Sequence, residues 1–221
     1  MPGMDGTGLL FRPLLKEFPP DIEARVISYP CDTKLSYSQL VKYVRRRLPE
    51  NKAFVLVAES FSGPIGYALA SSNPPSNLQA AVFVSTFISP PKSWLWRIPP
   101  FLLVLLLKLP LPSSVLKRFL FGKDVENQTV DLFKKAQKMV RSSMLAYRIR
   151  ETSRLEGGEK QIDIPCRYIV GGKDRLVSPI HFEEFRRLAP GIKLTEIPGP
   201  HFIMQAKPKE CAQIIQGYIK R

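Results

Sequence analysis

The stretch Val55-Leu-Val-Ala-Glu-Ser60-Phe-Ser-Gly-Pro-Ile-Gly-Tyr67-Ala68 decides the fold that this chain of 221 residues can adopt. It begins as a continuous apolar, β-branched run, which is typical of a strand covered on both faces. It continues as a helix-compatible sequence, so Ser60 lies at a corner between a strand and a helix. The small residues Ala58 and Ser62 stand two positions before and after Ser60, as in the elbow that presents a nucleophilic serine.

Small residues are required in such an elbow, because bulky side chains would collide where the helix passes close to the strand. The strained corner exposes the hydroxyl, and the helix N-terminus directs free N–H groups at a developing oxyanion. In an alternative alignment of the motif Ser62 lies at the corner, but Pro64 then occupies a position that requires a small residue. An ordinary turn with serines is the other interpretation of the motif alone. Glu59, next to the corner, is expected to face solvent.

Short β-branched runs alternate with helical patterns along the rest of the chain. Strands are predicted over Ala24–Tyr29, Ala53–Ala58, Ala80–Ser85, Arg167–Val170 and Lys193–Ile197. Helices are predicted over Ser36–Leu48, after a cap at Ser178 followed by Pro179, and from Pro208 onward. This alternation predicts an α/β fold with a doubly wound, mainly parallel sheet.

One stretch interrupts the alternation of strands and helices. Residues 90–155 have helical patterns punctuated by prolines, so we expect a helical lid inserted into a core formed by residues 1–89 and 156–221. Within it, residues 92–154 carry 13 basic and 4 acidic side chains, a net charge of +9 out of +14 for the whole chain. The same insertion contains the most apolar run of the sequence, Ile98–Leu107.

Two further residues complete a possible catalytic set. Asp174 follows a predicted strand in Gly171-Gly-Lys-Asp174, and His201 follows the next one in Gly199-Pro-His201. Each alone is explained as well by a turn or a solvated loop. Together with Ser60, however, they all follow the carboxyl ends of strands, where open α/β sheets place their sites. The order Ser, Asp, His is that of one class of nucleophile–acid–base triads.

These motifs resemble those of α/β-hydrolase-fold serine hydrolases, and in particular the small carboxylesterases of the carrier-protein methyl ester esterase type. The resemblance covers nearly the whole chain, and it includes the opening Pro2-Gly-Met-Asp-Gly-Thr-Gly8. It implies hydrolysis of a carboxylic ester or thioester through an acyl-enzyme on Ser60, with His201 as base and Asp174 orienting the imidazole. It implies no metal and no organic cofactor, and it makes the helical insertion a lid.

The opening loop corresponds to the oxyanion loop of that family. The resemblance implies that the backbone N–H groups of Met4, or alternatively Asp5, and of Phe61 hold the oxyanion. In the family a central strand leads into this loop, between the segments predicted here as strands at Ala24–Tyr29 and Ala53–Ala58. A single residue precedes the loop in this sequence, so we expect a gap in the sheet and an N-terminally truncated chain.

The lid is the guide to substrate and partners. Phe101, Leu102 and Leu105 are predicted to line an acyl pocket, although plain packing on the core explains them equally well. The substrate is then a small-molecule or lipid-like acyl ester. The basic surroundings suit an acidic carrier protein, a phosphorylated thiol ester or an anionic membrane surface. Nucleic acid is disfavoured, because a solvated helix face explains Arg45–Arg47 and no aromatic-basic motif accompanies it.

The cysteines and histidines narrow the remaining choices. The three cysteines, Cys31, Cys166 and Cys211, lie far apart in the sequence, which argues against a disulfide framework and against a zinc site. The two histidines are too few for a multi-histidine metal centre. No stretch has the features of a signal peptide or a spanning helix, so we expect a cytoplasmic protein, with attachment to a membrane surface as an option. The alternative function is a non-catalytic binding protein on the same scaffold, impaired by the missing strand.

Overall fold

A four-stranded parallel sheet forms the centre of the protein in the computed structural model, which describes residues 1–91, 97–109, 112–122 and 125–219. Its strands, in spatial order, are β1 (Phe54–Glu59), β2 (Leu78–Val84), β3 (Cys166–Gly171) and β4 (Lys193–Ile197). Because neighbouring strands are parallel, each connection crosses back over the sheet and places helices on its faces. The predicted α/β fold with a parallel sheet is confirmed.

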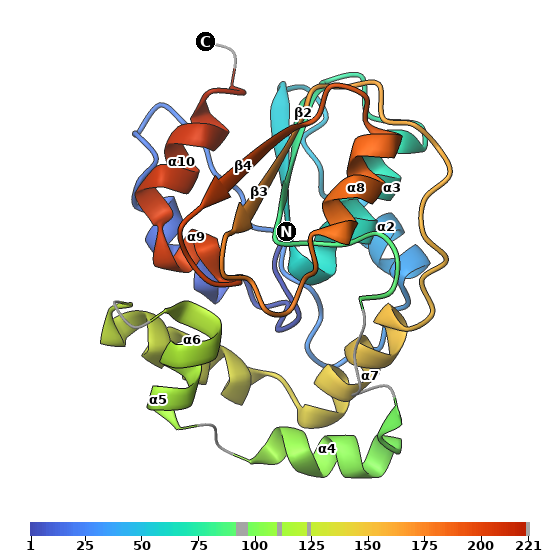
Figure 1. Ribbon diagram of the computed structural model, residues 1–221. Helices are drawn as coiled ribbons and strands as arrows, with labels where there is room; N and C mark the ends of the chain where they lie inside the picture. Colours follow the sequence, from blue (N-terminus) through green and yellow to red (C-terminus); the bar gives the residue numbers. More distant parts are fainter. Residues whose placement is uncertain (92–96, 110–111, 123–124, 220–221) are drawn as a thin grey trace.

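Helices cover both faces of the sheet (Figure 1). One face carries α2 (Tyr37–Arg45), α3 (Gly63–Ser71) and α8 (Ile180–Leu188). The other carries η1 (Leu9–Phe11), α1 (Arg12–Leu15), α9 (Ile203–Ala206) and α10 (Pro208–Gln216). The predicted start of the last helix at Pro208 is confirmed, whereas the predicted cap at Ser178 is wrong. The N-cap of α8 is Pro179, and no side chain caps this helix end.

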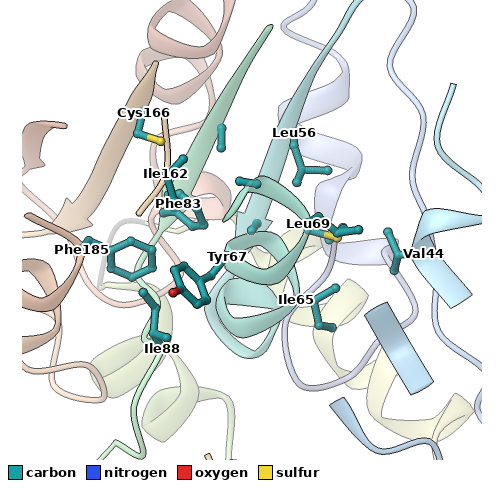
Figure 2. Close-up of a cluster of buried hydrophobic side chains, with 14 of the residues drawn as sticks. Val44, Leu56, Ile65, Tyr67, Leu69, Phe83, Ile88, Ile162, Cys166 and Phe185 are labelled. Atoms are coloured by element: carbon teal, nitrogen blue, oxygen red, sulfur yellow. The ribbon is translucent and has the colours of Figure 1, made fainter. Parts of the chain in front are cut away.

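The larger hydrophobic core lies between the sheet and α2, α3 and α8, as Figure 2 shows. Ile65 of α3 and Val44 of α2 are fully buried in it. Phe83 of β2 packs against Phe185 of α8, with ring centroids 4.4 Å apart. Burial of each such side chain stabilises the fold by roughly 1.5–3 kcal/mol, so this layer fixes where α3 lies on the sheet.

A smaller core covers the opposite face of the sheet. Val82, Val84 and Ile169 of the strands pack there against Cys211 and Ile215 of α10. Burial raises the pKa of the Cys211 thiol to about 12, so this side chain is neutral and packs as a small apolar group. Together the two cores hold the carboxyl ends of the strands in a fixed arrangement.

Residues 24–29 do not form a strand, so this prediction is wrong. The segment runs beside the opening loop, where the Tyr29 N–H donates to the Gly6 carbonyl at 2.7 Å. The Ser28 hydroxyl also donates to the carbonyl of Thr7, at 2.9 Å. The alternation of its side chains suits a strand, but no sheet backbone lies beside it to complete a ladder.

The gap expected beside β1 is a cavity of about 600 Å³. Residues 22–26 line one wall and residues 53–57 of the β1 edge line the other. At the end of this cavity Met1 lies against β1, with its amine donating to the Val57 carbonyl at 2.8 Å and its carbonyl accepting from the Glu59 N–H at 3.2 Å. These bonds fix the start of the opening loop beside the end of β1.

In the described part of the predicted lid every regular element is a helix. Its helices are α4 (Pro100–Lys108), α5 (Ser113–Leu116), the π-helical turn η4 (Lys117–Phe121), α6 (Asn127–Met139) and α7 (Ser142–Thr152). Residues 92–96, 110–111 and 123–124 of the predicted lid lie outside the described residues. Leu103 is fully buried and packs α4 against Ala146 and Ile149 of α7. This helical group lies below the carboxyl ends of the strands in Figure 1.

Candidate active site

The elbow at Ser60 joins β1 directly to a helix. Ser60 has a φ of 49°, the left-handed region that a non-glycine residue adopts only at some energetic penalty. The helix runs very close to the sheet, since a Cβ at Gly63 would lie 2.0 Å from Thr86 Oγ1 and a Cβ at Gly66 would lie 2.8 Å from Ala58 Cβ. Small residues are therefore required here, as the sequence pattern indicates.

The three candidate catalytic side chains lie together in the structure. His201 Nε2 is 3.1 Å from Ser60 Oγ, and His201 Nδ1 is 2.9 Å from Asp174 Oδ2. The side chains of His201 and Asp174 are only 5% and 2% exposed. Asp174 follows β3 and His201 precedes α9, so the carboxyl edge of the sheet supplies all three residues.

The surroundings of Asp174 keep its carboxylate ionised. Burial alone would raise the pKa of Asp174, but hydrogen bonds and the nearby imidazole of His201 outweigh burial and hold the pKa below its ordinary value. Asp174 Oδ1 accepts the N–H groups of Leu176 at 2.8 Å and Val177 at 3.0 Å. The other oxygen, Oδ2, is thus left to accept a hydrogen bond from the imidazole Nδ1–H.

Ser62, the corner of the alternative frame, has a different role. It is fully buried, and its hydroxyl donates to the carbonyl of Pro2 and is hydrogen-bonded to the Tyr29 hydroxyl. Ser62 therefore ties the opening loop to the elbow. The sequence pattern explains only the small size of this residue and gives no sign of these bonds.

The opening loop passes directly over the nucleophile. A Cβ at Gly3 would lie 3.7 Å from Ser60 Cβ, so the backbone next to Met4 approaches the elbow closely. Phe61 follows Ser60, and its buried ring stacks on Tyr37 with centroids 4.8 Å apart. Gly3, the residue before Met4, thus lies close to Ser60, and Phe61 directly follows Ser60 in the chain.

Arg148 of α7 holds the opening loop from the side of the lid. This residue is only 3% exposed. Its guanidinium donates to the carbonyls of Met4 at 2.9 Å, Asp5 at 2.7 Å and Pro30 at 2.9 Å. A buried charge that donates three hydrogen bonds to backbone carbonyls fixes the loop conformation strongly. Nothing in the local sequence around Arg148 indicates this contact.

Glu59 is buried, so the expectation that it faces solvent is wrong. It is only 3% exposed, and its Oε1 accepts a 2.9 Å hydrogen bond from Gln205 Nε2. Burial raises the pKa of Glu59 to about 7, while the Gln205 hydrogen bond and the charge of His201 lower it in part. A carboxyl group whose pKa lies near neutral therefore directly precedes Ser60.

The predicted pocket residues of the lid do not reach the site. Phe101, Leu102 and Leu105 are 71%, 43% and 59% exposed, on the solvent side of α4. The side of α4 that faces the site carries Leu103 and Leu107, whose clusters include Met4 of the opening loop. Because α4 is apolar at nearly every position, its pattern cannot indicate which face is buried.

The arrangement has the chemistry of a triad. A hydroxyl, an imidazole and a carboxylate are hydrogen-bonded in series at the carboxyl edge of a parallel sheet, under a loop that brings backbone close to the hydroxyl. This fold and this site define an α/β protein with a serine–histidine–aspartate constellation. The chain belongs to the alpha/beta hydrolase family, whose profile matches residues 2–214.

Comparisons with solved structures give the same fold. An enol-lactonase from Burkholderia xenovorans superposes with a TM-score of 0.69 at 14% identity, covering 98% of this chain and 88% of that chain. A hydrolase from Pseudomonas aeruginosa superposes with a TM-score of 0.70 at 13% identity, covering 99% of this chain and 88% of that chain. The type II thioesterase BorB from the borrelidin biosynthetic cluster superposes with a TM-score of 0.69 at 15% sequence identity, covering 99% of this chain and 90% of that chain. No curated protein matches the sequence.

Proposed function

We propose that the protein is a serine hydrolase that cleaves a carboxylic ester or thioester through an acyl-enzyme. The observation that carries this proposal is the hydrogen-bonded series Ser60–His201–Asp174, with distances of 3.1 Å and 2.9 Å. The fold of the chain supports it, because a lactonase and a thioesterase share that fold.

In the acylation step Ser60 Oγ attacks the substrate carbonyl. His201 Nε2 accepts the hydroxyl proton as the new C–O bond forms, and Asp174 stabilises the imidazolium through Nδ1. The tetrahedral intermediate then expels the alcohol or thiol, which takes the proton from His201 Nε2. The product that remains is an ester between the acyl group and Ser60.

In the deacylation step water replaces the leaving group. His201 Nε2 removes a proton from the water as its oxygen attacks the acyl-enzyme carbonyl, and the same proton returns to Ser60 Oγ when the acid departs. The amides of Met4 and Phe61 are the proposed donors to the oxyanion in both steps. Each such donor lowers the barrier by roughly 3–4 kcal/mol in related enzymes.

The acyl group of the proposed substrate is apolar. The Met4 side chain of the opening loop packs with Leu103 and Leu107 of α4 and with Ala146 of α7, so next to the Arg148 guanidinium the lid presents hydrocarbon to this loop. An acyl chain that leaves the carbonyl in this direction would contact no charged group of that cluster. An ester with a medium or long apolar acyl chain is therefore favoured over an acetate ester.

The proposal is tested with a fluorophosphonate probe and with a panel of nitrophenyl esters and acyl thioesters of increasing chain length. The purified chain should be labelled and should prefer apolar chains, whereas Ser60→Ala should abolish both labelling and turnover. Ser71→Ala is the matched control, since Ser71 ends α3, the helix that follows the elbow, and its Oγ has no hydrogen-bond partner among the described residues. Labelling that persists in Ser60→Ala contradicts the assignment of the nucleophile.

A further inference from the structure

The helix α4 leaves a row of large apolar side chains in solvent. We call this row the outer face of α4, and it comprises Phe101 (71% exposed), Leu102 (43%), Leu105 (59%), Leu106 (40%) and Leu109 (60%), the last just after the helix. Isolated exposed apolar residues are ordinary, but five within nine positions form a contiguous patch. Contact with water is unfavourable for such a patch, so it fits a partner that removes it from water.

The charged residues next to this patch along the chain are positive. Arg97 precedes α4 and Lys108 is its last residue, and both side chains are exposed. The sequence has no Asp or Glu between Arg97 and Gly122. Cationic groups at both ends of an apolar row fit a partner whose hydrocarbon lies beneath a layer of negative charge.

From these observations we propose that the outer face of α4 docks on the surface of an anionic lipid bilayer. The apolar side chains insert among the acyl chains, while Arg97 and Lys108 remain at the level of the lipid phosphates. The helix lies along the bilayer and does not cross it, since the described part of the chain contains no helix long and apolar enough to span a membrane.

A lipid surface fits the outer face of α4 better than a protein partner does. Apart from Lys108, no side chain of α4 carries a hydrogen-bonding group, so the face offers apolar contact with no polar group to fix an orientation. Protein interfaces normally include such groups, about one hydrogen bond per 100–200 Å². In Figure 1 α4 lies along the edge of the molecule away from the sheet, where a flat surface can reach it.

Docking at this face would bring the bilayer close to the candidate site. The opposite side of α4 buries Leu103, whose cluster includes Met4 of the opening loop, so one packed layer separates the outer face from that loop. Transfer of a lipid-like ester from the bilayer to Ser60 would rest on the proposed function. The docking itself needs no turnover.

The experiment is sedimentation of the full chain with sucrose-loaded vesicles. One vesicle type is phosphatidylcholine alone, and the other contains equal parts of phosphatidylcholine and phosphatidylglycerol. The parent chain should bind the anionic vesicles, and Phe101→Ser/Leu105→Ser should weaken the partition coefficient at least about tenfold, since two large apolar contacts are lost. Leu194→Ser, which changes a leucine 43% exposed on β4, is the matched control and should bind like the parent.

A second variant tests the charge contribution. Arg97→Gln/Lys108→Gln keeps the apolar row and should weaken binding to anionic vesicles, an effect that added salt should reproduce in the parent. Ser60→Ala should bind as the parent does, which separates docking from catalysis. The proposal is overturned if the parent binds neither vesicle type, binds both equally, or binds as well after Phe101→Ser/Leu105→Ser. A dimer abolished by that double change, without vesicle binding, would instead assign the face to a second copy.

Discussion

Gln205 Nε2 donates a 2.9 Å hydrogen bond to Glu59 Oε1, and both side chains are only 3% exposed. Glu59 immediately precedes Ser60, whereas Gln205 lies in α9, the short helix that follows His201. The bond therefore connects the elbow to the loop of His201 by a route other than the Ser60–His201 hydrogen bond. It fixes the distance between the two loops and places a titratable group between them.

The first prediction concerns the pH dependence of stability. The pKa of Glu59 is about 7 in the folded protein against an ordinary value of 4.5, mainly because of burial. The folded state thus favours the protonated carboxyl, and this contribution is full below pH 4.5 and is lost as the pH rises through 7. Glu59→Gln removes it, so the variant should gain stability relative to the parent over this range, by at most about 3 kcal/mol.

Urea denaturation of both proteins at a series of pH values measures this gain. The difference between the two proteins is the informative quantity, because the buried Met1 amine changes the parent in the opposite direction. Burial lowers the pKa of that amine to about 5, which increases stability as the pH rises from 5 to 8. Glu50→Gln, at an exposed site, should behave like the parent. A constant difference between Glu59→Gln and the parent would contradict the buried titration.

The second prediction is that Asp174→Asn disables the histidine by fixing the wrong tautomer. Asp174 Oδ1 accepts two backbone N–H groups, so the amide oxygen of the variant should occupy that position and its NH₂ should face His201 Nδ1. Nε2 would then carry the proton and could not accept one from Ser60. The kcat for a reactive ester should fall about 10⁴-fold, as in related triads. Asp163→Asn, at an exposed position, is the control.

The third prediction is that Arg148→Met loosens the opening loop. The variant keeps a long apolar side chain but leaves the carbonyls of Met4, Asp5 and Pro30 without their donor. We expect a loss of about 3 kcal/mol in unfolding free energy and a kcat reduced at least about tenfold, because the loop would hold its N–H groups less firmly. Arg186→Met, 67% exposed, should change neither value, and equal kcat for both variants would contradict this role.

The fourth prediction is that Gly63→Ala displaces the elbow. The added Cβ would lie 2.0 Å from Thr86 Oγ1 and 2.4 Å from the Phe87 carbonyl oxygen, and the backbone oxygen cannot rotate away. The unfolding free energy should fall by about 2 kcal/mol or more, and fluorophosphonate labelling of Ser60 should slow. Gly217→Ala, whose Cβ would lie 3.3 Å from the Ile214 carbonyl oxygen, should change the melting temperature much less. Unchanged labelling of Gly63→Ala would show that the helix can move without disturbing the nucleophile.

The sequence is a good guide to the parts of this fold that depend on local pattern. The four strands of the sheet follow from short β-branched runs, three of them largely apolar, and the elbow follows from small residues around Ser60. The Asp174 and His201 loops follow from their position after strands. Parallel strands end at one edge, so their order along the chain was enough to predict that the three side chains meet there.

Other parts of the site depend on contacts that no local pattern contains. Glu59 is buried next to Gln205, which lies 146 residues away in the sequence and donates a hydrogen bond to it. Arg148 donates to the carbonyl of Met4, which lies 144 residues away. Residues 24–29 have the alternation of a strand but lack a neighbouring backbone to pair with. For Phe101 and Leu105, apolar residues on every side of α4 concealed which face is buried.

Arg148 also limits how far the helical insertion can be exchanged between relatives. Helical insertions of this kind can be mistaken for independent units, yet here the insertion supplies the Arg148 guanidinium that holds the opening loop of the core. A chimera whose helical insertion comes from a relative without this arginine would keep Ser60, His201 and Asp174 but would lose the conformation of the opening loop. Grafting a new cap onto this scaffold therefore requires a replacement for that single side chain.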